Sequence, residues 1–257
     1  MDAGSQRSSR TLALVLEYDG STYHGFQRQH GLPTVAQRVE DALAQLFGHE
    51  VTIVAAGRTD QGVHARGQVV SCSTSSDFPL GRLALAASAL LRPHAIAVVR
   101  AAERPAGFCA RRDALARCYR YLILNRVAPS PLQRGRVFHV SRPLDAAAMH
   151  SAAAGLEGEH DFTAFCASRS DSDRMVRRIT AVGVRGQGEL VEVSVSADSF
   201  LHNMVRIIVG TLVEVGRGTR EVEDVETALQ SRRRARAGFT APPHGLYLEK
   251  VEYADPV

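Results

Sequence analysis

Apolar residues recur with two periodicities in the first part of the chain, that of a strand and that of a helix. Four segments are apolar or alternating over strand length and predict strands: 11–18, 51–56, 68–73 and 96–101. A helix is predicted after Pro33, because Thr34 and Gln37 form a capping box and apolar residues then recur every three or four positions. A second helix is predicted over the apolar segment 80–91. The order of elements is therefore βαββαβ.

The second part of the chain repeats this order with one additional helix before its last strand. The segments with strand character are 118–125, 179–185, 190–197 and 246–253. Those with helical character are 145–156, 200–215 and 221–230. The pattern predicts the α+β class, with two RRM-like or ferredoxin-like βαββαβ halves whose helices cover one face of a mainly antiparallel sheet. We predict a disordered tail over 1–10, an N-terminal half over 11–105 and a C-terminal half over 106–257.

The composition is that of a folded protein. The chain has 257 residues, 45% of them hydrophobic, and its first ten residues lack the apolar core of a signal peptide. No segment is apolar for long enough to cross a membrane. These features predict a cytoplasmic protein without a membrane partner.

The balance of charges changes this picture only slightly. The formal net charge is +4, and every basic residue except Lys250 is Arg, whose planar group binds phosphates bidentately. This favours an anionic partner, but a GC-rich genome produces the same preference for Arg. The four cysteines are too widely spaced for a zinc or redox motif. We therefore expect reduced thiols and neither a metal nor a cofactor.

The segment 57–65, with the sequence GRTDQGVHA, is the strongest candidate for chemistry. It follows the predicted strand 51–56 and places Asp60 between Arg58 and Gly62. A strand that ends in a polar, constrained loop is a common support for a catalytic group. The pattern Asp-x-Gly alone more often forms a side-chain-capped turn. Both interpretations are open at this point.

Segment 57–65 resembles the signature of the tRNA pseudouridine synthase A family, and four further segments resemble blocks of that family in the same order. They are 17–29 (EYDGSTYHGFQRQ), 119–121 (YRY), 161–163 (DFT) and 200–210 (FLHNMVRIIVG). The resemblance extends over nearly the whole chain. It implies two sheets around a central RNA-binding cleft, and a homodimer that binds tRNA with both subunits.

The resemblance also implies roles for single residues. Asp60 would be the nucleophile, Arg206 its ion-pair partner and Tyr119 the aromatic residue of the active site. Isomerisation of uridine needs one ionised carboxylate, and a nearby guanidinium favours the charged form of a carboxylate. His202 and Arg206 are one helical turn apart, so we expect them to share a face of the predicted helix 200–215.

Tyr119 can stack on an unpaired base, although a tyrosine in such a strand is more often a cross-strand packing residue. We expect one of Tyr119 and Tyr121 to face each side of the strand. Arg58 would hold either the loop or a phosphate.

The predicted substrate-binding residues are Tyr119, Arg58, His64, Arg111 and His202. Two positions depart from the pattern of the family: Phe26 stands where Trp is common, and Cys109 where His is common.

These observations predict a tRNA pseudouridine synthase, an isomerase that converts uridine to pseudouridine in the anticodon stem-loop. The resemblance implies tRNA positions 38–40. The alternative is a noncatalytic RNA-binding module with two RRM-like halves, which the lack of an aromatic-rich RNP1 block disfavours. A metal-dependent nuclease would need several carboxylates where segment 57–65 has one.

Overall fold

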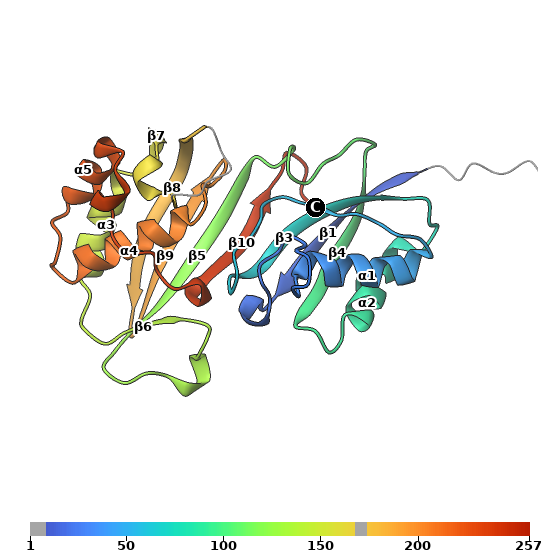
Figure 1. Ribbon diagram of the computed structural model, residues 1–257, viewed down its shortest axis with the longest axis horizontal. Helices are drawn as coiled ribbons and strands as arrows, with labels where there is room; N and C mark the ends of the chain where they lie inside the picture. The colour runs from blue at the N-terminus through green and yellow to red at the C-terminus, as the bar shows by residue number, and fades with distance from the viewer. Residues whose placement is uncertain (1–8, 168–173) are drawn as a thin grey trace, which may run out of the picture. The chain divides into compact units, whose positions relative to one another are not determined.

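A computed structural model describes residues 9–167 and 174–257 of the chain (Figure 1). Within these ranges it contains ten strands and five α-helices, and it divides into two compact units. The described part of the first unit consists of residues 9–115 together with Lys250–Val257, and the second unit is Ala116–Glu249. Most of the predicted tail, 1–10, lies outside the described residues, and Arg10 already belongs to a strand.

The first unit has the predicted order βαββαβ. Its elements are β1 (Arg10–Tyr18), α1 (Val35–Phe47), β2 (Val54–Ala55), β3 (His64–Thr74), α2 (Leu80–Leu90) and β4 (Ile96–Arg104). The strand order is β4-β1-β3-β10, where β10 (Leu246–Glu252) is the last strand of the chain and β2 pairs with β3 outside this path. β1 is antiparallel to both β3 and β4.

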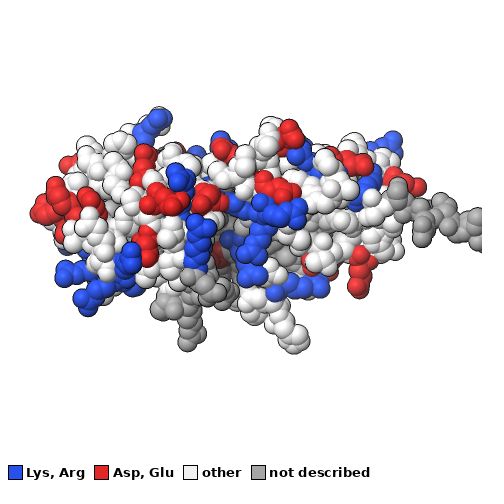
Figure 2. Space-filling view, turned by 90° about the horizontal axis from the view of Figure 1, so that it is seen from above, with Lys and Arg blue, Asp and Glu red and all other residues white. Residues whose placement is uncertain are grey.

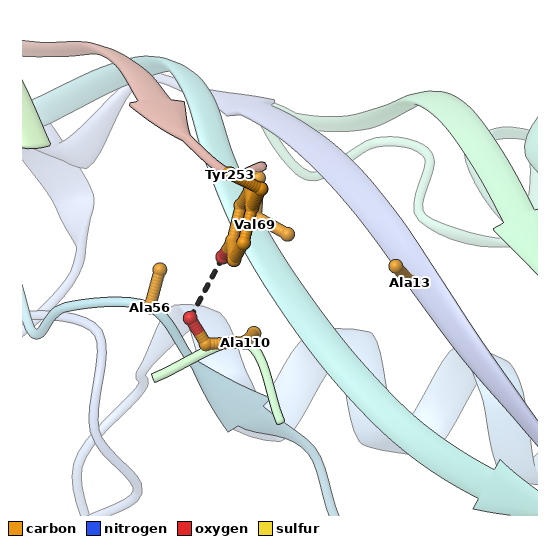
Figure 3. Packing of buried hydrophobic residues seen from close by; sticks show 5 residues of the cluster. All are labelled: Ala13, Ala56, Val69, Ala110 and Tyr253. Carbon is orange, nitrogen blue, oxygen red and sulfur yellow. Dashed lines mark hydrogen bonds between the residues drawn. The ribbon is translucent and has the colours of Figure 1, made fainter. Parts of the chain in front are cut away.

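Both faces of β1 are buried. Leu12, Leu14 and Leu16 alternate along the strand and are fully buried, as the period of a strand with an apolar face requires. Ala13, which lies on the other side of the pleat, belongs to a second apolar cluster with Ala56, Val69, Ala110 and Tyr253 (Figure 3). Helices α1 and α2 lie together beside the strands of this unit (Figure 1).

Helix α1 begins where the sequence predicts. The Thr34 hydroxyl accepts a hydrogen bond from the Gln37 amide at 3.4 Å, which satisfies one of the free N–H groups of the first turn. Gly48 ends the helix with a φ of 75°, a conformation that glycine adopts without a steric penalty.

The second unit is also mixed. Its strands are β5 (Ala116–Asn125), β6 (Phe138–Val140), β7 (Gly158–Asp161), β8 (Val176–Gln187) and β9 (Leu190–Ala197), in the order β10-β5-β9-β8-β7. Its helices are α3 (Ala146–Ala154), α4 (Met204–Gly216) and α5 (Asp224–Ser231). Almost every residue of α4 is buried, and α3 packs on both α4 and β8 (Figure 1). Short 3-10 helices cover Gly20–Thr22, Pro131–Gln133, Thr163–Phe165, Arg234–Arg236 and Pro243–Gly245.

The sheet pairings confirm a mainly antiparallel arrangement. Only the β5–β6 pair is parallel among the pairs recorded for the described residues. That the halves are RRM-like, and that a cleft lies between them, stay predictions. The compact units divide after Leu115, and Lys250–Val257 belongs to the first unit although it comes last in the chain. The domain boundary after residue 105 stays a prediction.

Some predicted boundaries are wrong. The strand predicted over 51–56 is reduced to Val54–Ala55, whereas β3 begins at His64 instead of residue 68. The helix predicted from residue 200 begins at Met204, because Asn203 has a φ of 61° and breaks the helical path. The short strands β6 and β7 were not predicted. No helix in the described ranges is long and apolar enough to cross a membrane.

Candidate active site

The loop between β2 and β3 presents Asp60 on a tight turn. The Asp60 carbonyl accepts a hydrogen bond from the Val63 amide at 3.1 Å, and Gly62 has a φ of 79° within this turn. Asp60 itself is half-buried, whereas its neighbours Thr59 and Val63 are buried. This turn is closed by a backbone hydrogen bond, and it leaves Asp60 partly open to solvent. A cap by the Asp60 side chain stays a prediction.

Thr59 is anchored by two hydrogen bonds. Its hydroxyl lies 2.7 Å from the hydroxyl of Tyr18 at the end of β1. Its carbonyl accepts from the Phe26 amide at 3.0 Å. Gly25 makes this approach possible, since a Cβ at that position would lie 2.9 Å from the Thr59 carbonyl oxygen. The segment 17–29 thus holds the residue directly before Asp60.

The other side of the turn is anchored by His64. Its ring is buried, with 1% of the residue exposed, and its Nδ1 accepts a hydrogen bond from the Gly20 amide at 3.1 Å. Asp19 Oδ1 is also 3.1 Å from Nδ1, which makes an ion pair only when the ring is protonated. Gly20 is required here, because a Cβ would lie 1.9 Å from the Val63 carbonyl oxygen.

These contacts show what His64 does in the loop. The buried ring supports the backbone around Asp60. Its predicted contact with substrate stays a prediction.

The Tyr18 hydroxyl remains neutral over the physiological pH range. Burial raises the pKa of Tyr18 to about 12, more than the hydrogen bonds with Thr59 and Gln68 lower it. Gln68 also donates from Nε2 to the Gly57 carbonyl at 2.7 Å. The loop is thereby fixed at its start as well as next to Asp60.

Arg58 and Arg111 are both exposed, on different loops of the first unit. Arg58 lies on the Asp60 loop. Arg111 follows Ala110, whose amide donates to the Ser71 hydroxyl at 3.0 Å and whose carbonyl accepts from the Tyr253 hydroxyl at 2.7 Å (Figure 3). Hydrogen bonds to both the amide and the carbonyl of buried Ala110 therefore fix the turn that carries Arg111.

In the second unit, Tyr119 lies on β5 and is 9% exposed. Its ring meets the Phe200 ring edge-on, with centroids 5.1 Å apart. The expectation that Tyr119 and Tyr121 face opposite sides is wrong, because residues two apart in a strand share a face. Arg120 occupies the opposite face, where it pairs with Glu192 and Glu249, while the Tyr121 hydroxyl donates to the Pro242 carbonyl at 2.7 Å.

Arg206 lies in the first turns of α4 and is held by that helix and the segment that crosses it. Its Nε donates to the Ala241 carbonyl at 2.8 Å, and its Nη1 donates to Asn203 Oδ1 at 2.6 Å. The Ala241 amide returns a hydrogen bond to the Arg206 carbonyl. These two groups are polar partners for an Arg on a helix whose other residues are mainly buried and apolar. The ion pair with Asp60 stays a prediction.

The predicted shared face of His202 and Arg206 is wrong. His202 precedes α4, and the left-handed conformation of Asn203 separates it from the helix. His202 is exposed, and its carbonyl accepts from the Ala167 amide at 3.0 Å.

The predicted residues are thus divided between the units. Arg58, Asp60, His64 and Arg111 belong to the first, and Tyr119, His202 and Arg206 to the second. Sequence reasoning missed Tyr18, Gly20 and Gly25 as supports of the Asp60 loop. Their signal was present, because all three lie in segment 17–29, which resembles a block of the same family.

Many arginines are paired with carboxylates. Arg178 pairs with Glu159 and Arg126 with Glu189, and Figure 2 shows acidic side chains interspersed with basic ones on the face that it draws. The number of arginines therefore overstates the charge available for a polyanion. No group of three or more His, Cys, Asp or Glu in the described part of the chain is arranged to hold a metal ion.

Comparison of the sequence with known proteins identifies one family. The family model for tRNA pseudouridine synthases matches residues 14–111 and 152–254. The chain is 44% identical to tRNA pseudouridine synthase A of Acetivibrio thermocellus over 95% of its length and 100% of the relative's. It is 46% identical to the protein of that name from Caulobacter vibrioides, over 94% of this chain and 98% of the relative, and 47% identical to that from Moorella thermoacetica, over 94% and 99%.

The chain belongs to the tRNA pseudouridine synthase family. Members of this family are isomerases that act on tRNA.

Proposed function

We propose that the protein converts uridine to pseudouridine in the anticodon stem-loop of tRNA, at positions 38–40, with Asp60 as the nucleophile. The observation that carries the proposal is the Asp60 loop, in which a half-buried carboxylate follows a residue fixed by two hydrogen bonds. The curated relatives named tRNA pseudouridine synthase A match almost the whole chain, which supports the choice of tRNA as substrate.

The reaction breaks the bond between C1′ and N1 of uridine and forms a bond between C1′ and C5. C5 loses its proton and N1 gains one, so the product has the same composition and no electrons are transferred. The Asp60 carboxylate supplies the electron pair that stabilises the sugar or the base while the two are separate. Both sites of attack are compatible with this role.

Tyr119 and Arg206 complete the proposed catalytic set. Tyr119 offers an aromatic surface for the detached uracil, and its edge contact with Phe200 holds the ring in one orientation. Arg206 contributes a guanidinium that two hydrogen bonds orient from the protein side. A positive charge held in place at the site stabilises the ionised nucleophile.

The target uridine must leave the base stack before it can react. Extrusion of a base costs a few kcal/mol, which contacts with the RNA backbone offset. We assign these contacts to the exposed residues Arg58, Arg111 and His202, with His64 supporting the loop from within. The homodimer and the cytoplasmic location are part of the same proposal.

The positions of modification test the proposal. Unmodified tRNA transcripts with uridine at positions 38, 39 or 40 are incubated with the protein, and pseudouridine is mapped by carbodiimide labelling and primer extension. We expect pseudouridine at these positions and none in matched transcripts that carry cytidine there. Pseudouridine elsewhere in the tRNA would contradict the specificity. Binding without any pseudouridine would favour the noncatalytic RNA-binding module.

A further inference from the structure

The residue directly before Asp60 takes part in a buried pair of hydroxyl groups. The Tyr18 and Thr59 oxygens are 2.7 Å apart, and the two residues are only 3% and 6% exposed. They are 41 positions apart in the chain, one at the end of β1 and the other in the Asp60 loop. The Tyr18 ring also packs against Phe26, with centroids 6.1 Å apart.

Both peptide groups that flank Asp60 have fixed orientations. The Thr59 carbonyl belongs to the peptide that ends at the Asp60 amide, and it accepts from Phe26 at 3.0 Å. The Asp60 carbonyl belongs to the next peptide, and it accepts from Val63 at 3.1 Å. The backbone dihedrals of Asp60 lie between these two groups, so its Cα–Cβ direction depends on both hydrogen bonds.

The hydroxyl pair fixes the side chain of Thr59, whose carbonyl is already fixed by the hydrogen bond from Phe26. Two hydrogen bonds, one to its side chain and one to its carbonyl, come from the same segment of chain, 17–29. A buried polar pair has one favourable geometry, whereas two apolar side chains of the same size could slide past each other. The pair therefore selects one position of the loop.

We propose that Tyr18 and Thr59 are positioning residues for Asp60, and that their hydroxyl pair sets the rate of the chemical step rather than the affinity for RNA. This proposal rests on the proposed function, in which Asp60 is the nucleophile. A displacement of about 1 Å at a reacting group can cost about 100-fold in rate. Neither hydroxyl needs to touch the substrate for this effect.

The test measures kcat and KM for unmodified tRNA with the variants Tyr18→Phe, Thr59→Val, Thr59→Ser and the double variant Tyr18→Phe/Thr59→Val. Tyr18→Phe and Thr59→Val each remove one hydroxyl and retain the size of the side chain. We expect each to lower kcat by about 10-fold or more, with KM within about twofold of the wild type. The kcat of the double variant should be no lower than that of the less active single variant, because either change alone already breaks the hydrogen bond between the two hydroxyl groups. Thr59→Ser keeps the hydroxyl and should retain most of kcat.

Two variants control for the general loss of a buried hydroxyl. Tyr247→Phe removes the hydroxyl that donates to the Arg136 carbonyl at 2.7 Å in the second unit. Thr74→Val removes the hydroxyl that pairs with His49 Nε2 at 2.9 Å, at the far end of β3 from the Asp60 loop. Both should unfold at a lower temperature and keep kcat. All assays are made below the melting temperature of the least stable variant. If Tyr18→Phe does not fold, the kcat of Thr59→Val decides the result.

The outcomes separate this proposal from the one on which it rests. If Asp60→Asn is inactive while Tyr18→Phe and Thr59→Val keep the wild-type kcat, the positioning role is wrong and the nucleophile stands. If Asp60→Asn keeps the wild-type kcat, Asp60 is not the nucleophile, and that part of the proposed function is wrong. An increase in KM with unchanged kcat would make the pair part of RNA binding and would overturn the positioning role, as would an equal loss of kcat in the two control variants.

Discussion

Asp60 and His64 illustrate how neighbours decide what a residue does. The resemblance to a family placed both in the site, but the structure gives them different surroundings. Asp60 is half-buried on the turn, whereas His64 is enclosed and bonded to the backbone of Gly20. The residue type alone cannot separate a side chain that meets the substrate from one that supports the loop, because both need a fixed geometry.

We predict that His64→Leu lowers the stability of the first unit. The substitution leaves the Gly20 amide buried without an acceptor, which costs about 1–3 kcal/mol in the free energy of unfolding. Urea denaturation of the full chain measures this change. The matched control is His30→Leu at an exposed position, where a change within about 0.5 kcal/mol is expected. Unchanged stability with weakened tRNA binding would instead make His64 a substrate contact.

At the scale of elements, the sequence predicts the type of most helices and strands better than their ends. α2 and β9 agree with their predicted ranges to within one residue. β2 is much shorter than predicted, mainly because residues 51–53 lie outside it. Ala56, directly after β2, lies in the buried cluster with Val69 and Tyr253 (Figure 3). That cluster joins residues distant in sequence, so no local pattern could reveal it.

The start of α4 illustrates the same limit. Apolar residues continue at helical spacing through Phe200 and Leu201, so the pattern predicts a helix there. The left-handed backbone at Asn203 ends this continuity, and Asn is one of the few residues that adopt it readily. In the functional site, the sequence identified the Asp60 loop, but the partners of Arg206 at Ala241 and of Thr59 at Tyr18 depend on long-range packing.

Substitution by alanine should change the free energy of unfolding in opposite directions at two glycines within helices. A Cβ at Gly210 in α4 would lie 1.8 Å from the Phe239 carbonyl oxygen, so Gly210→Ala must displace the crossing segment that holds Arg206. We expect a loss of about 1–3 kcal/mol in the free energy of unfolding. A Cβ added at Gly81 in α2 would meet no atom of the described residues within 4 Å, and Gly81→Ala should gain about 0.5–1 kcal/mol.

Thermal and urea denaturation of both variants measure these changes. The packing argument would be contradicted by a Gly210→Ala protein as stable as the wild type. A destabilised Gly81→Ala protein would contradict the propensity argument.

At the scale of the whole molecule, the residues of the proposed site come from both compact units. Its predicted residues come from the loop before β3, from β5 and from α4, and the last residues of the chain pack with the first unit. The family match likewise covers two ranges of residues that extend from near the start to near the end. The proposed activity is therefore a property of the full chain.

The proposed RNA contacts predict a steep dependence of binding on salt. Each phosphate contact that a protein makes releases bound counterions. The slope of the logarithm of the association constant against the logarithm of the salt concentration becomes more negative by about 0.7–0.9 for each contact. Arg111→Gln should weaken tRNA binding and reduce the magnitude of the slope by about one contact. Arg126→Gln is the control, because Arg126 is not one of the proposed RNA contacts; it pairs with Glu189 at 2.9 Å. Equal slopes for wild type and Arg111→Gln would remove Arg111 from the interface.

Release of tritium from tRNA labelled at C5 of uridine tests the central claim most directly, since C5 must lose its proton when the new bond forms. The wild type and Asp60→Asn are compared on the same tRNA in the presence of a chelator, with tRNA affinity measured in parallel. We predict release by the wild type, release reduced to background by Asp60→Asn, and similar affinity for both. Release by Asp60→Asn at the wild-type rate would contradict the assignment of Asp60 as nucleophile.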